Sequence, residues 1–93
     1  MKAALEEGCL VIFCPGCGHK HHIAVNGLDP AHRIQWKWNN DLFHPTLEPS
    51  VRYSVDERTV CHFHIENGFI RFVNDYWHPL AGQTIELPDL KYN

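Results

Sequence analysis

Residues 13–23, FCPGCGHKHHI, concentrate side chains that could bind a metal ion or transfer protons. Cys14 and Cys17 are separated by two residues, a spacing that lets two thiolates reach one ion, and Gly18 permits the tight turn beneath it. The same spacing occurs in thioredoxin-like redox pairs, where the pair opens a helix after a strand. Here the strand-like segment HHIAV follows instead, so the motif predicts half of a zinc site.

A zinc site requires a third ligand from elsewhere in the chain. Cys61 is the better candidate because it lies at the open end of a predicted hairpin, which can bring it against the CxxC knuckle. Cys9 lies on the strand that enters the knuckle and is expected to point into the core as a small apolar side chain. The alternative for Cys61 is a buried free thiol.

The fourth ligand is expected to be a histidine. His78 ranks first, because the chain leaves the hairpin beside Cys61 and the segment DYWHP turns there. His62 ranks second, because it is adjacent to Cys61 but points to the opposite face of a regular strand, so a bulge would be needed. His21, just after the knuckle, ranks third. The predicted zinc ligands are therefore Cys14, Cys17, Cys61 and His78.

A second group of polar residues lies on the same predicted hairpin. His62 and His64 form an i, i+2 pair like that of a cupin, but Glu66 follows too soon for the cupin pattern. We expect these residues to form an outer-face patch that is either catalytic or simply solvated. No HExxH or comparable signature identifies a general base. The catalytic candidates are Glu48, His62 and Asp75.

Length and composition exclude several classes of protein. At 93 residues the chain is expected to form one zinc-binding domain over residues 1–93, whose small core would gain much of its stability from a metal. The net charge of −3 and the lack of a Lys/Arg cluster argue against duplex DNA as a partner. The longest apolar run, CLVIF, is far shorter than the ~20 residues of a membrane span, and MKAALEEG does not resemble a signal peptide. We therefore expect a cytoplasmic protein, in a compartment where disulfides are rare.

The elements that must position these residues are predicted to be mostly β, as a small antiparallel domain with a zinc-ribbon-like knuckle. CLVIF and HIAV are expected to be strands on either side of the knuckle, and HRIQWKW, VRYSV and TIEL are expected to be strands further along. MKAALEE is expected to form one or two helical turns that end at Gly8.

The segment TVCHFHIENGFIRFV predicts an Asn-Gly hairpin whose register can be derived. With Asn67 and Gly68 in the turn, Phe63 faces Phe72 and His64 faces Arg71. Side chains alternate along a strand, so each strand divides between two faces. The core face is expected to carry Cys61, Phe63, Ile65, Ile70 and Phe72, and the outer face His62, His64, Glu66 and Arg71.

The motifs CPGCGHKH, HPTLEPSV, CHFHIENGFIRFVND and HPLAGQTIELP together resemble a domain family of unknown function from phages and prophages. Its members are often mislabelled ammonia monooxygenase. The resemblance covers residues 13–88. The residues that match the family pattern are Cys14, Cys17, His21, Pro45, Thr46, Pro49, Ser50, Cys61, His62, Asp75 and the segment 78–88. The family usually has CHSFI where this chain has CHFHI, so His64 departs from its pattern.

Related domains occur beside bacterial ubiquitin-like conjugation operons. The resemblance therefore implies a zinc-binding protein with a protein partner in the host or the phage, and a zinc peptidase activity on a protein tag. The peptidase activity is implied by the resemblance alone, whereas zinc binding is also predicted from the spacing of the cysteines.

Two functions compete at this point. The first is a protein-interaction module whose zinc is mainly structural, since a closed site of three cysteines and one histidine does no chemistry. The second is a minimal zinc-dependent hydrolase, which needs an open coordination position and a carboxylate as general base. A weaker alternative is binding of single-stranded nucleic acid through the aromatic residues Trp36, Trp38, Tyr53 and Trp77. The sequence favours the module, because thiolate-rich zinc is more often structural than catalytic.

Overall fold

Short strands make up the regular structure of this chain. The computed structural model describes residues 1–54, 60–74 and 79–90, and the regular elements in these ranges are all strands. They are β1 (Ala4–Glu6), β2 (Cys9–Cys14), β3 (His19–Ala24), β4 (Lys37–Trp38), β5 (Leu47–Glu48), β6 (Val51–Ser54), β7 (Val60–Glu66), β8 (Phe69–Phe72) and β9 (Thr84–Glu86). In these same ranges, no helix has the length and apolar character needed to span a membrane. The predicted mostly β class is confirmed.

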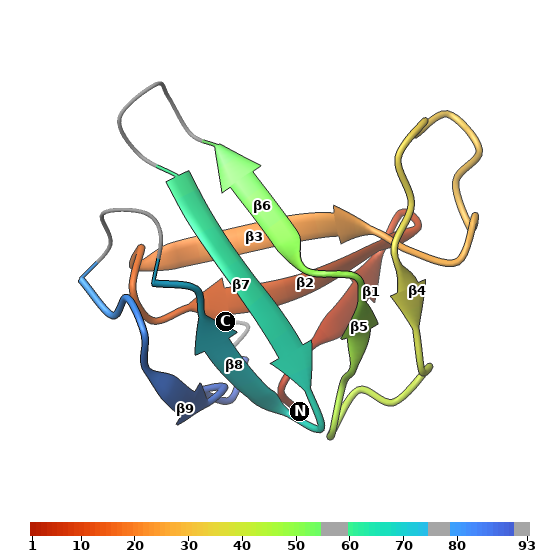
Figure 1. The fold of residues 1–93 in the computed structure, drawn as a ribbon. Helices are drawn as coiled ribbons and strands as arrows, with labels where there is room; N and C mark the ends of the chain where they lie inside the picture. Colours follow the sequence, from red (N-terminus) through yellow and green to blue (C-terminus); the bar gives the residue numbers. More distant parts are fainter. Residues whose placement is uncertain (55–59, 75–78, 91–93) are drawn as a thin grey trace.

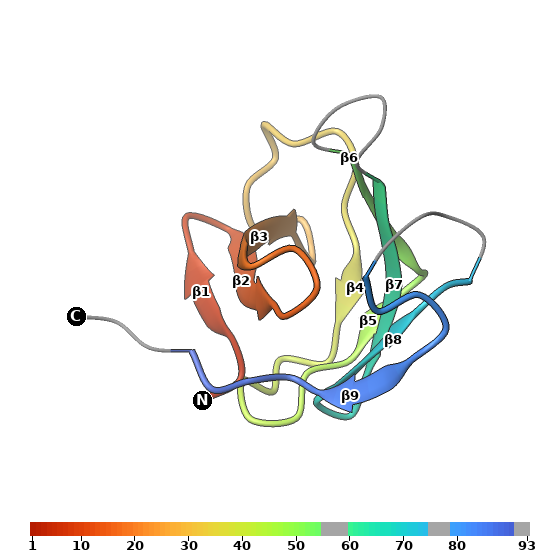
Figure 2. The same ribbon diagram turned by 90° about the vertical axis from the view of Figure 1, so that its left-hand side faces the viewer.

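The strands form three antiparallel sheets, with the orders β1-β2-β3, β4-β5 and β6-β7-β8-β9 (Figure 1). Figure 2 shows the first and third sheets as facing layers, with β4 and β5 beside the third. The core fills the space between the layers. It includes Leu10, Ile12 and Ile23 from the first sheet and Phe63, Ile65, Ile70 and Phe72 from the third. Each sheet therefore has one apolar inner face and one outer face.

The predicted hairpin register is confirmed over the whole of its paired length. Phe63 pairs with Phe72 and His64 pairs with Arg71 across β7 and β8. Asn67 and Gly68 form the turn with φ angles of 49° and 84°, which are the left-handed values that a two-residue turn of this kind requires. Inner residues of β7 are buried while outer ones are not, so the side-chain faces also follow the prediction.

The predicted N-terminal helical turns are absent, because Ala4–Glu6 forms β1 and pairs with Cys9–Val11 of β2. Glu7 and Gly8 make the turn between the strands, with φ angles of 51° and 80°. A seven-residue helix is too short to be stable alone, whereas the mostly buried β2 offers a row of unpaired backbone groups. Strand pairing therefore overrides the helical propensity of the segment.

The predicted strand HRIQWKW is reduced to the two residues of β4. Residues 26–35 instead form a loop, and Ile34 is 70% exposed. The side chain of Gln35 holds this loop by donating to the backbone carbonyls of Asp29 and His32, at 2.9 and 3.0 Å. Local side-chain to backbone hydrogen bonds therefore replace the expected strand ladder.

The packing of the core gives a first prediction. Phe63→Ala is expected to lower the free energy of unfolding by about 3–5 kcal/mol, because Phe63 is fully buried and contacts Phe72 at a ring-centroid distance of 6.3 Å. Phe69→Ala, in the same hairpin but 45% exposed, is the matched control and should cost less than about 1 kcal/mol. Urea unfolding of both variants measures the difference. Equal losses would contradict the description of the core.

Candidate functional site

Four side chains with metal-binding atoms converge where the first and third sheets meet. They are Cys14, Cys17, His21 and Cys61, and their ligand atoms all lie within 4.8 Å of one another. The Sγ atoms of Cys14 and Cys61 are 3.7 Å apart. Two thiolates bound at about 2.3 Å to one tetrahedral ion stand about 3.8 Å from each other, so this spacing fits a shared metal.

The first and third sheets both contribute to this cluster. Cys14 is the last residue of β2, and Gly18 closes the knuckle by donating its N–H to the carbonyl of Cys14 at 2.9 Å, with a φ of 76°. β3 then follows the knuckle directly, as the zinc-site reading predicts and the redox reading does not. Cys61 comes from the core face of β7. A metal bound here would connect the two layers of the fold.

His21 completes the cluster from the inner face of β3. Its side chain is fully buried and stacks near Tyr53 and Phe63, at ring-centroid distances of 4.2 and 5.7 Å. Both ring nitrogens are buried, and neither has a hydrogen-bond partner among the described residues. Leaving a buried polar atom unsatisfied costs about 1–3 kcal/mol. A metal ion bound by the three neighbouring thiols would satisfy one of these nitrogens.

The three thiols of the cluster compete for a single negative charge. The hydrogen bond with Cys61 lowers the pKa of Cys14 to about 3, whereas burial and the charge of Cys14 raise the pKa of Cys17 to about 11. The same hydrogen bond, together with burial, raises the pKa of Cys61 far above its ordinary value. A divalent cation would end this competition, because it stabilises all three thiolates at once.

Three of the four predicted zinc ligands lie together in the cluster. Cys14, Cys17 and Cys61 lie together, and the histidine beside them is His21, which the sequence analysis ranked third. His78, ranked first, lies outside the described residues. His62, ranked second, is not part of this cluster and contacts Ser50 instead.

Cys9 does not take part in the cluster, as predicted, but it does not point into the core either. It is buried with 8% exposure, and its Sγ lies 3.7 Å from Nε2 of His32, on the other face of β2. Burial and the negative charges of Asp29 and Glu7 raise its pKa. This thiol therefore has no thiolate character of its own that would make it a nucleophile.

A serine and a histidine are paired on the outer side of the third sheet. Oγ of Ser50 and Nε2 of His62 are 3.0 Å apart, and both side chains are half-buried. The Nδ1 atom of His62 is buried. A histidine at this distance can accept the hydroxyl proton of a serine and so make its oxygen a nucleophile.

The pairing of β6 with β7 brings this serine and histidine together. Arg52 lies opposite His62 in the register, and Ser50 precedes Arg52 by two residues, which is the spacing of side chains on one face. The indole Nε1 of Trp36 donates to the backbone carbonyl of Ser50 at 3.1 Å and holds the segment from the other side. The outer-face position predicted for His62 therefore places it beside a hydroxyl.

The remaining candidates are more dispersed. Glu48 is exposed on β5 opposite Lys37, and Asp75 lies outside the described residues. Among the aromatic residues, Trp38 is buried, while Trp36 and Tyr53 are half-buried and pack against the core. Trp77 lies outside the described residues. Trp36, Trp38 and Tyr53 thus pack in or against the core rather than forming an exposed stacking surface.

The sequence matches the model of a protein family over residues 1–73. That family is BubE, described as bacterial ubiquitination-like system serine protease. The chain belongs to the BubE family. The range that matches BubE contains the whole cysteine–histidine cluster together with Ser50 and His62, and it ends before Asp75 and His78. Comparisons with curated proteins and with solved structures give no match.

The BubE description directs attention to the serines of the chain. The sequence contains two, Ser50 and Ser54, both within the matched range. The hydroxyl of Ser50 contacts His62, and the sequence analysis missed this role. The available signal was the motif HPTLEPSV, which contains Ser50, but no spacing rule connects it with a histidine twelve residues later.

Replacing His21 and replacing His62 are expected to affect the metal content of the protein differently. His21→Ala is expected to weaken metal affinity by more than about 100-fold, since it removes a direct ligand, whereas changes to outer residues cost 10–100-fold. His62→Ala should keep the metal and the fold, because its ring contacts Ser50 and not the thiols. Elemental analysis after dialysis tests both variants. Metal loss in His62→Ala with retention in His21→Ala would reverse the assignment.

Proposed function

We propose that this protein is a serine-type peptidase of a bacterial ubiquitination-like system, with Ser50 as nucleophile and His62 as general base. The observation that carries the proposal is the 3.0 Å contact between Ser50 Oγ and His62 Nε2, in a chain whose family is described as a serine protease. The sequence alone nominated His62 without its partner. The contact supplies that partner.

The chemistry follows the general scheme of acyl transfer. Ser50 Oγ attacks the carbonyl carbon of the scissile bond while His62 Nε2 takes the hydroxyl proton. His62 then gives that proton to the leaving nitrogen as the bond to it breaks, which leaves an acyl group on Ser50. His62 next activates a water molecule that hydrolyses the acyl group and frees the serine. Asp75, a catalytic candidate from the sequence, lies outside the described residues and has no assigned role in this scheme.

We propose further that Cys14, Cys17, His21 and Cys61 bind zinc and that this zinc is structural. The donor set fits, because three thiols and one imidazole are ligands typical of closed zinc sites, and the buried nitrogens of His21 need a partner. Four protein ligands complete a tetrahedral site and leave no position for a reacting water. The metal would hold Cys61 in place, and His62 is the next residue of β7.

This assignment takes one part from each of the two functions that the sequence analysis left open. The zinc keeps the structural role of the interaction module, while hydrolysis is carried out by the serine rather than by the metal. A zinc-dependent hydrolase would need an open coordination position, whereas His21 offers the cluster a fourth protein ligand. We expect a protein partner, a ubiquitin-like tag or its conjugate, and a reducing compartment such as the bacterial cytoplasm, in keeping with four free cysteines.

The proposal is tested with ubiquitin-like proteins whose C-terminus is fused to a reporter. Cleavage at the junction is expected, and a serine-directed fluorophosphonate should block it. A brief exposure to chelator that leaves the protein folded should not. Cleavage that stops on chelation of the folded protein would indicate a zinc hydrolase, and no cleavage over a broad panel would leave the interaction module.

A further inference from the structure

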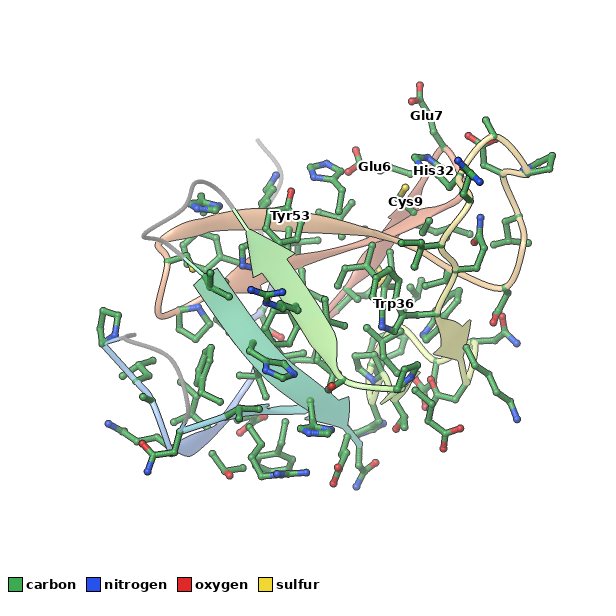
Figure 3. The ribbon with its side chains drawn as sticks, turned by 45° about the horizontal axis from the view of Figure 1, so that its top comes forward. Glu6, Glu7, Cys9, His32, Trp36 and Tyr53 are labelled. Atoms are coloured by element: carbon green, nitrogen blue, oxygen red, sulfur yellow. The ribbon has the colours of Figure 1, made fainter. Side chains whose placement is uncertain are left out.

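Trp36 connects the first sheet to the segment that carries Ser50. Its side chain is half-buried and packs against the core. The indole Nε1 donates a hydrogen bond to the backbone carbonyl of Ser50 at 3.1 Å. Figure 3 shows Trp36 beside the chain segment that enters β6. The proposed acyl-transfer scheme gives this side chain no role, although it contacts the main chain of the proposed nucleophile.

The backbone of Ser50 lies outside the strand ladders. β5 ends at Glu48 and β6 begins at Val51, so residues 49 and 50 belong to neither strand. The first pair of the β6–β7 ladder is Val51 with Phe63. The 3.0 Å separation between Oγ of Ser50 and Nε2 of His62 therefore depends on contacts beyond this ladder. The hydrogen bond from the Trp36 indole to the Ser50 carbonyl is such a contact.

The backbone of Trp36 is itself anchored to the residues that follow β3. Its N–H donates to the carbonyl of Ala24, and its carbonyl accepts from the N–H of Asn26, both at 2.9 Å. These two bonds form the parallel bridge between Val25 and Trp36. The side chain of Asn26 also contacts both the N–H and the carbonyl of Trp38, at 2.8 and 3.1 Å. The first sheet therefore holds the donor that the Ser50 carbonyl accepts.

A contact of this kind affects catalysis more than it affects stability. One hydrogen bond to a backbone carbonyl contributes little to the net stability of a domain. In contrast, misplacing a reacting group by about 1 Å can lower the rate of a reaction by about 10²-fold. A displaced nucleophile slows the chemical step and leaves substrate binding unchanged, so the loss is expected in kcat and not in KM.

We propose that Trp36 is a positioning residue, whose indole N–H holds the Ser50 carbonyl so that the Ser50 hydroxyl stays within hydrogen-bond distance of His62. This inference rests on the proposed role of Ser50 as nucleophile. Trp36 acts through the main chain of Ser50 and touches neither the reacting hydroxyl nor the imidazole. The sequence analysis considered Trp36 only as an aromatic side chain for stacking on nucleic acid.

The test is Trp36→Phe, which removes the N–H donor and keeps an aromatic ring. The kcat for cleavage of a ubiquitin-like fusion is expected to fall by about 10- to 100-fold, with KM within about twofold of the wild type. Metal content should not change, because Trp36 lies outside the cysteine–histidine cluster. If this variant does not fold, 3-benzothienylalanine at position 36 replaces the N–H with sulfur at nearly constant ring size and carries the same test.

Nitrogen-15 NMR of the His62 ring gives a second readout, which requires no activity. Ser50→Ala defines the Nε2 signal of an imidazole that has lost its serine partner. The signal of Trp36→Phe should move from that of the wild type towards that of Ser50→Ala. A purely structural role of Trp36 would lower the melting temperature and leave this signal in place.

The matched control is Trp38→Phe. Trp38 also donates its indole N–H to a backbone carbonyl, that of Asp41 at 3.4 Å, and it is more deeply buried than Trp36. This variant should lose more stability than Trp36→Phe, because it leaves a cavity in the core. It should nevertheless keep the kcat and the His62 signal of the wild type. Equal losses of kcat in the two variants would overturn the proposal.

Failure of this inference and failure of the peptidase proposal give different results. An active wild type whose Trp36→Phe variant keeps both kcat and the His62 signal would contradict the role of Trp36 alone. An inactive wild type whose His62 signal still moves in Trp36→Phe would contradict the peptidase proposal, while supporting control of the Ser50–His62 contact by Trp36.

Discussion

Replacing Ser50 with alanine is expected to lower kcat/KM for cleavage of a ubiquitin-like fusion by about 10³- to 10⁶-fold. The loss is this large because the variant has no atom that can form the covalent intermediate. Metal content and melting temperature should stay close to those of the wild type, since the Ser50 side chain is half-buried and contributes a hydrogen bond to His62 but no ligand.

Ser54→Ala is the matched control, because Ser54 is the only other serine in the sequence. It should retain activity within a few-fold of the wild type. Retained activity in Ser50→Ala, with loss in Ser54→Ala, would place the nucleophile at Ser54. Retained activity in both variants would exclude a serine mechanism.

Cys61→Ser is expected to remove the metal from the cluster and to abolish the cooperative thermal transition near the wild-type temperature. Structural zinc sites supply about 10 kcal/mol or more of apparent binding free energy, which is comparable with the total stability of a small domain. Cys61 joins the third sheet to the knuckle of the first, so the loss should separate the two layers.

Cys9→Ser is the control for the loss of the metal and of the cooperative thermal transition. It is measured in protein that contains one metal equivalent. Cys9 lies outside the cluster, so the melting temperature of the Cys9→Ser variant should differ from that of the wild type by only a few degrees. Circular dichroism melting curves together with zinc analysis give both quantities. A Cys61→Ser protein that keeps its metal and melts as the wild type does would rule out the assignment of Cys61.

Local sequence signals predicted the parts of the fold that depend on neighbouring residues. The Asn-Gly turn set the β7–β8 register, and with it the inner position of Cys61 and the outer position of His62. The spacing of Cys14 and Cys17 predicted half of the metal cluster. These features rest on turn geometry and strand alternation, which are both visible in a short window of sequence.

Contacts between residues that are distant in the sequence could not be predicted in the same way. His21 reaches the cluster only because β3 packs its inner face against Tyr53 and Phe63 of the other sheet. Ser50 reaches His62 only through the β6–β7 register, which no two-residue turn fixes. Long-range contacts of this kind depend on which strands pair and on how the layers meet, and the periodicity of a single sequence records neither.

The cysteine–histidine cluster and the serine–histidine pair are joined by one strand. Cys61 and His62 are adjacent in β7, with Cys61 directed into the cluster and His62 directed to Ser50. The position of the proposed general base would therefore depend on the position of a proposed metal ligand. Under these proposals, a structural metal would be necessary for catalysis without taking part in it.

The most direct test is labelling of the metal-loaded protein with a fluorophosphonate, followed by intact mass measurement and peptide mapping. The expected result is one adduct per chain, located on Ser50 and lost in His62→Ala. An adduct on another residue, or none on the folded and metal-loaded protein, would contradict the proposal that Ser50 and His62 form the catalytic pair.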